Sequence, residues 1–325
     1  MPTRVRGQFL IHMNYFWSFG SMFVGGLAWL ILSNNGWRLL TYLTTIPVLC
    51  SCTLAAIYLP ESPRWLMVEG RVKDAEIVLR NIGLINNCEI EPFQLKHVEN
   101  HERFLKYDDF FNKNNIKLTI PLWISWFAFG FSYYAIVLFA TVIFEKNTDD
   151  NNDNPTCDFN YAPIFYSATS ELLGLYMLTL TIDSIGRVPT QIGCFISVAI
   201  FVIFMGSDLN DISTIIFALL ARLFAISTNT VVWITTPEFY PTEIRASGHA
   251  VSSGMARFGA LLSPFAAESV SLSTLGVGLV IALVNVIGAC ASCYLPETKG
   301  MYWGLCVCIC VCIYCGVLCI VYIYI

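Results

Sequence analysis

Eight apolar runs, each about 20 residues long, dominate this 325-residue sequence. An α-helix of that length crosses the hydrocarbon core of a bilayer, where only helices and closed barrels satisfy their own backbone hydrogen bonds. Charged residues make up 13% of the chain, whereas about a quarter is usual in a soluble protein. The sequence therefore predicts an all-α, multi-pass membrane protein. The runs cover residues 8–32, 37–59, 118–144, 161–182, 189–206, 213–236, 246–270 and 274–295.

Basic residues are distributed unevenly among the connections between these runs. Five alternate connecting segments hold 14 of the 18 Lys and Arg residues. Because Lys and Arg accumulate in cytoplasmic loops, these segments and the amino terminus are predicted to be cytoplasmic. The five segments are residues 1–7, 60–117, 183–188, 237–245 and 296–300.

The longest of these segments has helical features of its own. Ser62 is a suitable cap for a helix that begins at Pro63. Further on, an apolar stripe with helical spacing predicts a second short helix that ends near Gly83, with a Glu76–Arg80 ion pair on its surface. The stripe consists of Ala75, Val78, Leu79 and Ile82. The polar residues that follow, 86–116, are interpreted as a linker.

Two short signatures occur twice in the chain. P-T-x-x-R begins at Pro2, in a basic variant, and again at Pro241, an offset of 239 residues. P-E-[ST] begins at Pro60 and again at Pro296, an offset of 236 residues, and each pair of signatures encloses two apolar runs. Nearly equal offsets indicate an internal duplication. We therefore expect two parallel repeats, the first of which lacks its front part.

Four motifs carry a resemblance to a known family. The sequence reads PESPRWL with a following G-R at 60–71, D-x-x-G-R at 183–187, P-E-x-Y-P-T-x-x-R at 237–245 and PETKG at 296–300. Together they resemble the sugar and organic-ion branch of the major facilitator superfamily. The run Ser253 to Ala260 and the triplet Ser132-Tyr133-Tyr134 are similar to a synaptic-vesicle subgroup of that branch. The resemblance implies two six-helix bundles with the substrate path between them.

The resemblance also implies a division of the chain. Residues 1–59 correspond to the last two helices of the N-terminal bundle, 60–116 to the cytoplasmic loop between bundles, and 117–300 to the six-helix C-terminal bundle. Four front helices are expected to be missing, which leaves a partial major facilitator fold with eight membrane helices. The Cys- and Tyr-rich tail, 301–325, is apolar and long enough for a ninth crossing. Its alternating dipeptides suggest the hypothesis that it is translated non-coding sequence.

Ionisable groups inside apolar runs are costly and are therefore candidate functional residues. Glu171, Arg222 and Arg257 are candidates for substrate or ion binding; structural pairing, for example of Glu171 with Arg222, is the alternative. Tyr133 and Tyr134 are candidates for stacking on a ring-containing substrate, with packing as the alternative. In related carriers the position of Arg257 is acidic for cations and basic for anions, so the resemblance favours an anionic solute.

A second candidate group lies at the predicted cytoplasmic turns. It comprises Asp183, Gly186, Arg187, Glu238 and Arg245. The resemblance implies that such charge clusters hold the outward-facing state and break when the two bundles rock. Ordinary flanking charges are the alternative interpretation.

The sequence thus predicts a secondary active transporter of a small organic solute, with an anion favoured, that works by alternating access. Its partners would be the lipid bilayer, the solute and a proton or other coupling ion, in the plasma membrane or an intracellular vesicle membrane. No nucleotide-binding G-x-x-x-x-G-K-[ST] occurs, and no cofactor, metal, nucleic acid or enzymatic activity is expected. The alternative is a truncated, non-transporting membrane protein with a regulatory or vesicle-associated role. The histidines form no nucleophile–base set for a membrane enzyme.

Overall fold

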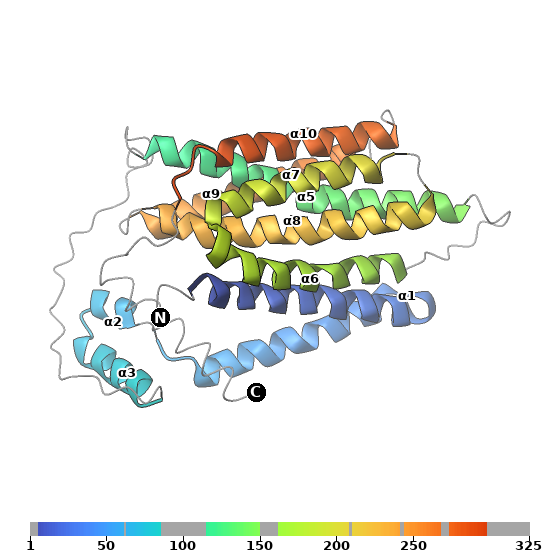
Figure 1. Ribbon diagram of the computed structural model, residues 1–325. Coiled ribbons are helices and arrows are strands. Elements are labelled where there is room, and N and C mark those ends of the chain that lie inside the picture. Colours follow the sequence, from blue (N-terminus) through green and yellow to red (C-terminus); the bar gives the residue numbers. More distant parts are fainter. Residues whose placement is uncertain are drawn as a thin grey trace. The chain divides into compact units, whose positions relative to one another are not determined.

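The computed structural model describes residues 6–61, 63–85, 115–149, 162–207, 210–240, 244–267 and 273–297, and its regular structure there is helical (Figure 1). A helix covers most of the described part of each predicted span, and the described residues outside it are one to three at the end of a span. The linker after residue 85 and the 301–325 tail lie outside the described residues. The helices are α1 (Arg6–Tyr58), α2 (Pro63–Val68), α3 (Val72–Ile85), α5 (Ile116–Asp149), α6 (Ala162–Ile185), α7 (Arg187–Met205), α8 (Asp211–Phe239), α9 (Arg245–Ala267) and α10 (Thr274–Ser292).

Helix α1 contains two of the predicted spans. Its helical path is interrupted at Gly36, where φ is 71° and ψ is 173°. Glycine tolerates a positive φ because it has no Cβ atom. The segments Ile11–Leu32 and Gly36–Tyr58, on either side of the interruption, are each long and apolar enough to cross a membrane. The break therefore falls where the sequence predicts it.

Four more described segments meet the same criterion of length and hydropathy. Helices α6 and α9 are 24 and 23 residues long, which is sufficient for a crossing, but they are less apolar. Both carry charged residues, Glu171 in α6 and Arg257 in α9. The four segments are Ile116–Ile143, Arg187–Met205, Ile212–Phe239 and Thr274–Ser292.

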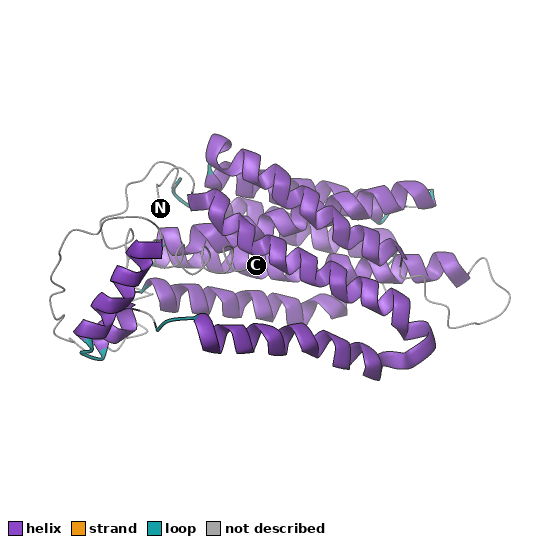
Figure 2. Ribbon diagram, turned by 90° about the horizontal axis from the view of Figure 1, so that it is seen from below, coloured by secondary structure: helices purple, strands orange, loops and turns teal. Residues whose placement is uncertain are grey.

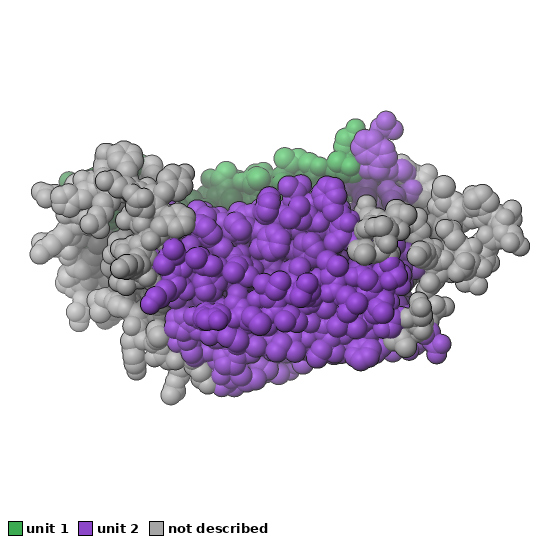
Figure 3. Space-filling model, turned by 90° about the horizontal axis from the view of Figure 1, so that it is seen from above, with its two compact units in different colours: residues 1–3, 41–104, 301–325 green, residues 4–40, 105–300 purple. Residues whose placement is uncertain are grey.

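The chain forms two compact units, which Figure 3 colours separately. The larger comprises residues 4–40 and 105–300. Within it, α5 packs against α8, α9 and α10, α7 packs against both α8 and α10, and α6 packs on α8. The first half of α1 meets α6, where the rings of Trp29 and Phe165 lie 6.0 Å apart. Figure 2 shows that the long helices of this larger unit run roughly along a common direction.

Helices α5 and α9 cross closely because glycine stands at two contact points. A Cβ atom on Gly130 would collide with the backbone carbonyl of Ala256, and one on Gly259 with the carbonyl oxygen of Phe127. A third glycine of the region, Gly254, has no atom within 4 Å of the position of its Cβ. Small residues allow membrane helices to approach to backbone contact. The close packing of α5 and α9 therefore depends on Gly130 and Gly259 and not on Gly254.

The smaller unit includes the second half of α1 together with α2 and α3. Helix α2 begins at Pro63, as predicted, and α3 follows a turn at Gly70, where φ is 75°. The predicted end at Gly83 is wrong: Gly83 is buried inside α3, which continues to Ile85, because packing outweighs its low helix propensity. The ion pair at the start of α3 joins Arg71 and Asp74 at 2.7 Å.

The crossing of α5 and α9 leads to a prediction. Replacing Gly259 with alanine should destabilise the protein by about 1–3 kcal/mol, because the added methyl group overpacks a backbone contact. The same change at Gly254 should be neutral or slightly stabilising, because alanine is the better helix former and the space is open. Thermal unfolding of the two variants in detergent measures the difference. Equal effects would contradict the assigned crossing.

Candidate functional site

The carboxylate of Glu171 is the centre of a polar cluster inside the larger unit. Glu171 lies near the middle of α6, and its exposed fraction is 0%. Arg222 of α8 donates from Nε to Glu171 Oε1 at 2.9 Å, an ion pair. The structure therefore contains the pairing of Glu171 with Arg222 that the sequence left as an alternative.

Two other helices complete the environment of this carboxylate. The hydroxyl of Tyr133, on α5, donates to Glu171 Oε1 at 2.9 Å, and that of Ser18, on α1, donates to Oε2 at 3.0 Å. The indole of Trp17 donates to the Tyr133 oxygen at 3.3 Å. We call Ser18, Tyr133, Glu171 and Arg222 the buried cluster. The sequence did not indicate Ser18 or Trp17, because a lone serine or tryptophan in an apolar run carries no distinguishing pattern.

The buried cluster is electrically neutral and its charges are desolvated. Transferring an ion pair out of water is costly, and removing one partner of a buried pair typically costs about 3–5 kcal/mol. Both carboxylate oxygens of Glu171 accept hydrogen bonds, which offsets part of this cost. Chemically, the cluster can exchange a proton or rearrange its hydrogen bonds, but it offers no net charge to a solute.

The remaining sequence-predicted binding residues lie apart from this pair. Tyr134 is 38% exposed and its ring contacts that of Tyr133 edge-on, at 5.4 Å between centroids. Arg257 is exposed near the middle of α9. Within the described residues its guanidinium has no hydrogen bond and no counter-ion. The structure thus brings Glu171, Arg222 and Tyr133 together and leaves Arg257 outside their contacts.

A second group of charges lies where α6, α7 and α8 end or begin. Arg187, the first residue of α7, lies 3.0 Å from Asp183 in the last turn of α6 and 3.6 Å from Glu238 in the last turn of α8. Asp183 and Glu238 belong to the helices and not to the turns where the sequence placed them. Arg187 therefore faces a carboxylate on each of the two neighbouring helices.

Glu297, from the P-E-T-K-G segment, completes this group. Its carboxylate accepts from the backbone N–H groups of Arg187 at 2.9 Å and Val188 at 3.0 Å. A carboxylate is favourable there because the first N–H groups of a helix lack intrahelical partners. At Gly186 φ is 118°, and a Cβ atom would lie 2.9 Å from Glu297 Oε2, so glycine is needed for both conformation and space. We call Asp183, Arg187, Glu238 and Glu297 the cytoplasmic cluster, after the side of the membrane that the distribution of Lys and Arg predicts for them.

Arg245, the fifth residue predicted for this group, makes a different contact. Its Nε donates at 3.3 Å to the backbone carbonyl of Tyr240, which is the C-cap of α8. Basic side chains near a helix C-terminus satisfy carbonyls that have no intrahelical partner. Arg245 therefore joins the end of α8 to the beginning of α9.

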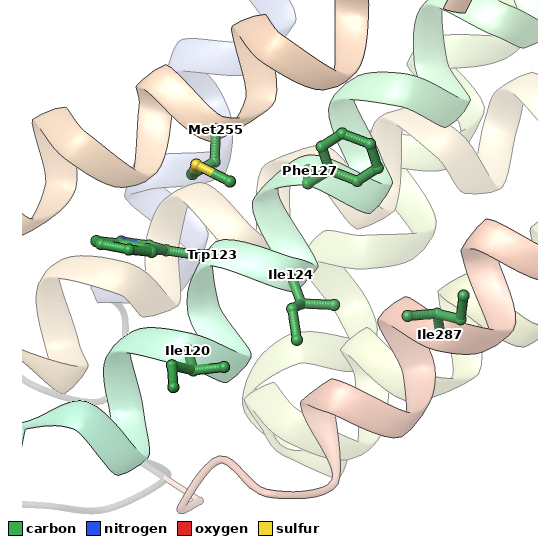
Figure 4. Close-up of a pocket in the computed structure, with 6 residues that line it drawn as sticks. All are labelled: Ile120, Trp123, Ile124, Phe127, Met255 and Ile287. Carbon is green, nitrogen blue, oxygen red and sulfur yellow. The ribbon is translucent and has the colours of Figure 1, made fainter. Parts of the chain in front are cut away.

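A cavity of about 320 Å³ opens elsewhere on the larger unit (Figure 4). Its lining is apolar and comes from α5, α9 and α10, and none of the predicted binding residues contributes. Binding sites for small polar solutes place a few polar groups on an apolar wall, so this cavity does not match the predicted solute site. The lining residues are Ile120, Trp123, Ile124, Phe127, Met255 and Ile287.

Comparison with known proteins decides the family. The family described as "Sugar (and other) transporter" matches residues 1–303 of this chain. The chain belongs to this transporter family. Its synaptic vesicle 2-related relatives from Xenopus laevis and Bos taurus are 32% and 31% identical, over 92% of this chain and 57% of each relative. An organic cation/carnitine transporter 7 from Arabidopsis thaliana is 28% identical over 92% of this chain and 68% of that protein.

A solved structure supports the same fold. The proton:xylose symporter XylE, of the major facilitator superfamily, superposes with a TM-score of 0.67 and 22% identity, over 92% of this chain and 66% of that one. The predicted partial major facilitator fold and multi-pass membrane location are thereby confirmed. This member of the transporter family spans 57% of the length of its vesicle-related relatives.

The ion pair of the buried cluster leads to a prediction for this transporter-family chain. Arg222→Met alone leaves an unpaired buried carboxylate and should cost about 3–5 kcal/mol of stability. The double change Glu171→Gln with Arg222→Met should cost less than the single change, because no buried charge remains. Thermal unfolding in detergent tests this, with Ser18→Ala, expected to cost about 1 kcal/mol, as the control for losing one hydrogen bond. A double variant that is as destabilised as Arg222→Met, or more so, would show that an unpaired charge is not the source of the cost.

The carboxylate at the start of α7 leads to another prediction. Glu297→Gln should cost about 1–2 kcal/mol, because an amide nitrogen cannot accept from a backbone N–H and the charge at the helix N-terminus is lost. Hydrogen exchange at Arg187 and Val188 should accelerate. Asp74→Asn, which removes a carboxylate from an exposed pair, is the matched control and should leave exchange in α7 unchanged. Unchanged exchange in Glu297→Gln would contradict the capping role.

Proposed function

We propose that this protein acts in secondary active transport of a small organic anion, as the C-terminal bundle and adjoining helices of a carrier. Membership of the transporter family supports the general activity. The observation that carries the choice of an anion is the state of Arg257. This cation lies near the middle of α9, is exposed, and has no counter-ion among the described residues.

The surroundings of Arg257 favour an anion with an apolar body. Its neighbours on the outer side of α9 are large and apolar: Phe258 is 53% exposed, Leu261 64% and Phe265 75%. A lone cation at membrane depth attracts an anion strongly where the dielectric constant is low. The apolar side chains next to it supply contact area for the remainder of the solute. A cationic solute would be repelled at the same position.

The coupling ion we propose is a proton, with Glu171 as its acceptor. Protonation of Glu171 would remove the counter-charge of Arg222 and alter the hydrogen bonds from Ser18 and Tyr133. Ser18 belongs to α1, assigned from the family resemblance to the other bundle, so the bond links the two halves of the carrier. Because no nucleotide-binding motif occurs in the sequence, an ion gradient would supply the energy.

Alternating access would use the cytoplasmic cluster as a reversible lock. Asp183, Arg187, Glu238 and Glu297 join α6, α7, α8 and the segment after α10 at one end of the unit. All four residues belong to the predicted C-terminal bundle, so the lock would hold the shape of this end of the bundle while the two bundles rock around a central site. The Arg187–Asp183 pair suits opening best, because the partly exposed Asp183 can be rehydrated when the pair breaks.

The test of this function is uptake into proteoliposomes, measured for this chain alone and for the chain preceded by the four front helices that the family resemblance implies. Organic anions should be taken up in preference to matched cations and neutral sugars. Arg257→Ala should lower anion uptake by roughly 10- to 100-fold, the value of a charge-assisted hydrogen bond, and Arg257→Lys should retain part of it.

Arg38→Ala is the matched control for this experiment. Arg38 is also an exposed arginine of an apolar helix, but it lies next to the break in α1 and stacks on Trp37 at 4.9 Å. Its replacement should leave uptake unchanged. Failure of both chains to take up any organic anion, or equal uptake by Arg257→Ala and the unmodified protein, would refute the proposal.

A further inference from the structure

Helix α3 has one face that is already covered within the smaller unit. Ala75 is fully buried and Gly83 is buried, while the rest of the same side, including Val72 and Leu79, is partly covered. Helix α2 packs against α3, and its residue Leu66 is 2% exposed. This contact accounts for the apolar stripe that the sequence indicated on α3.

The opposite face of α3 is also apolar, but it is exposed. Ile77 is 57% exposed, and Leu84 is 75% exposed. Lys73 and Arg80 are exposed on the same face. With 100° of rotation per residue, positions 73, 77, 80 and 84 fall within an arc of about 60° around the helix. One narrow stripe thus combines two large aliphatic side chains with two cations, whereas Ile85, 45% exposed, lies about 80° beyond its edge around the helix.

The charge on this stripe has one sign. Asp74 lies off the stripe and pairs with Arg71 at 2.7 Å. Glu76 is partly buried outside the arc, and among the described residues neither Lys73 nor Arg80 forms an ion pair. An exposed helix face with alternating aliphatic and basic residues matches the interface of an anionic membrane, where aliphatic groups enter the acyl boundary and basic stems extend to the phosphates.

We propose that the Lys73–Ile77–Arg80–Leu84 face of α3 binds anionic phospholipids of the cytoplasmic leaflet. Two observations favour the membrane over a soluble partner. The segment Gly36–Tyr58 is apolar enough to cross the membrane and ends shortly before α3 begins at Val72, so the helix is tethered close to a lipid surface. The excess of Lys and Arg in residues 60–117 places this segment on the cytoplasmic side, where anionic lipids are concentrated.

The experiment uses the full chain in nanodiscs of zwitterionic phosphatidylcholine, with or without 30–40% phosphatidylserine (about the range that gives a strongly negative surface). Hydrogen exchange in α3 should be slower in the phosphatidylserine discs. Each basic residue near such a surface changes binding by about fivefold, so Lys73→Gln with Arg80→Gln should weaken membrane binding of α3 roughly 25-fold and abolish the difference. Ile77→Ser with Leu84→Ser should raise exchange in both kinds of disc.

The matched control is Lys96→Gln with Arg103→Gln, which removes the same charge from the same cytoplasmic segment outside α3. It should preserve the lipid dependence. If exchange in α3 is independent of phosphatidylserine, or if both double variants lose the dependence equally, the face does not bind anionic lipid. A third outcome would also overturn the proposal. If α3 is equally protected in both discs and Lys73→Gln with Arg80→Gln has no effect, the face packs against another part of the protein.

Discussion

A carboxylate buried among apolar helices has to be matched by donors, and the contacts of Glu171 meet this constraint. Arg222 neutralises the charge, while the hydroxyls of Tyr133 and Ser18 satisfy the two oxygens. Since these groups come from α8, α5 and α1, and Glu171 from α6, one side chain fixes the relative depth of four helices. Apolar contacts alone would tolerate sliding, because in lipid they distinguish one register from the next only weakly.

The ends of α6, α7 and α8 are also positioned by charged groups that need partners, but one of these groups is partly exposed to water. Glu297 reaches the first N–H groups of α7 from a position 110 residues later in the chain, and Arg187 of α7 contacts the last turns of α6 and α8. Asp183 is partly exposed, with 18% of its side chain accessible, whereas Arg187 and Glu238 are as buried as the interior pair, at 6% and 4%. A partly exposed carboxylate is rehydrated when its pair breaks, whereas a buried one has no such substitute. The Arg187–Asp183 pair can therefore open more readily than the Arg187–Glu238 pair or the Glu171–Arg222 pair.

The sequence predicts the helices well because their existence depends on local composition. The break at Gly36, the start at Pro63 and the eight long runs all follow from residue types within a few positions. The pairing of Glu171 with Arg222 could also be proposed from the sequence, because few ionisable groups lie in the apolar runs and a buried charge needs a partner. The contacts of Ser18 and Glu297 could not be predicted, because they depend on which helices meet in space. Gly83 was misjudged because its burial is a tertiary effect.

The pairing inside the buried cluster also determines what the rest of the protein offers to a solute. If Glu171 lacked Arg222, it would be a second unpaired charge, opposite in sign to Arg257, and would favour cations as strongly as the proposed solute-binding role of Arg257 would favour anions. With the pair formed, the cluster carries no net charge and contributes only dipoles. It therefore does not cancel the positive electrostatic potential of Arg257 on α9. Selectivity for the sign of a solute would then depend on a residue outside the cluster, while the cluster itself holds the helices in register. Under the proposed function the two tasks fall to different residues, so a substitution at Arg257 would leave the contacts that hold the helices in register intact.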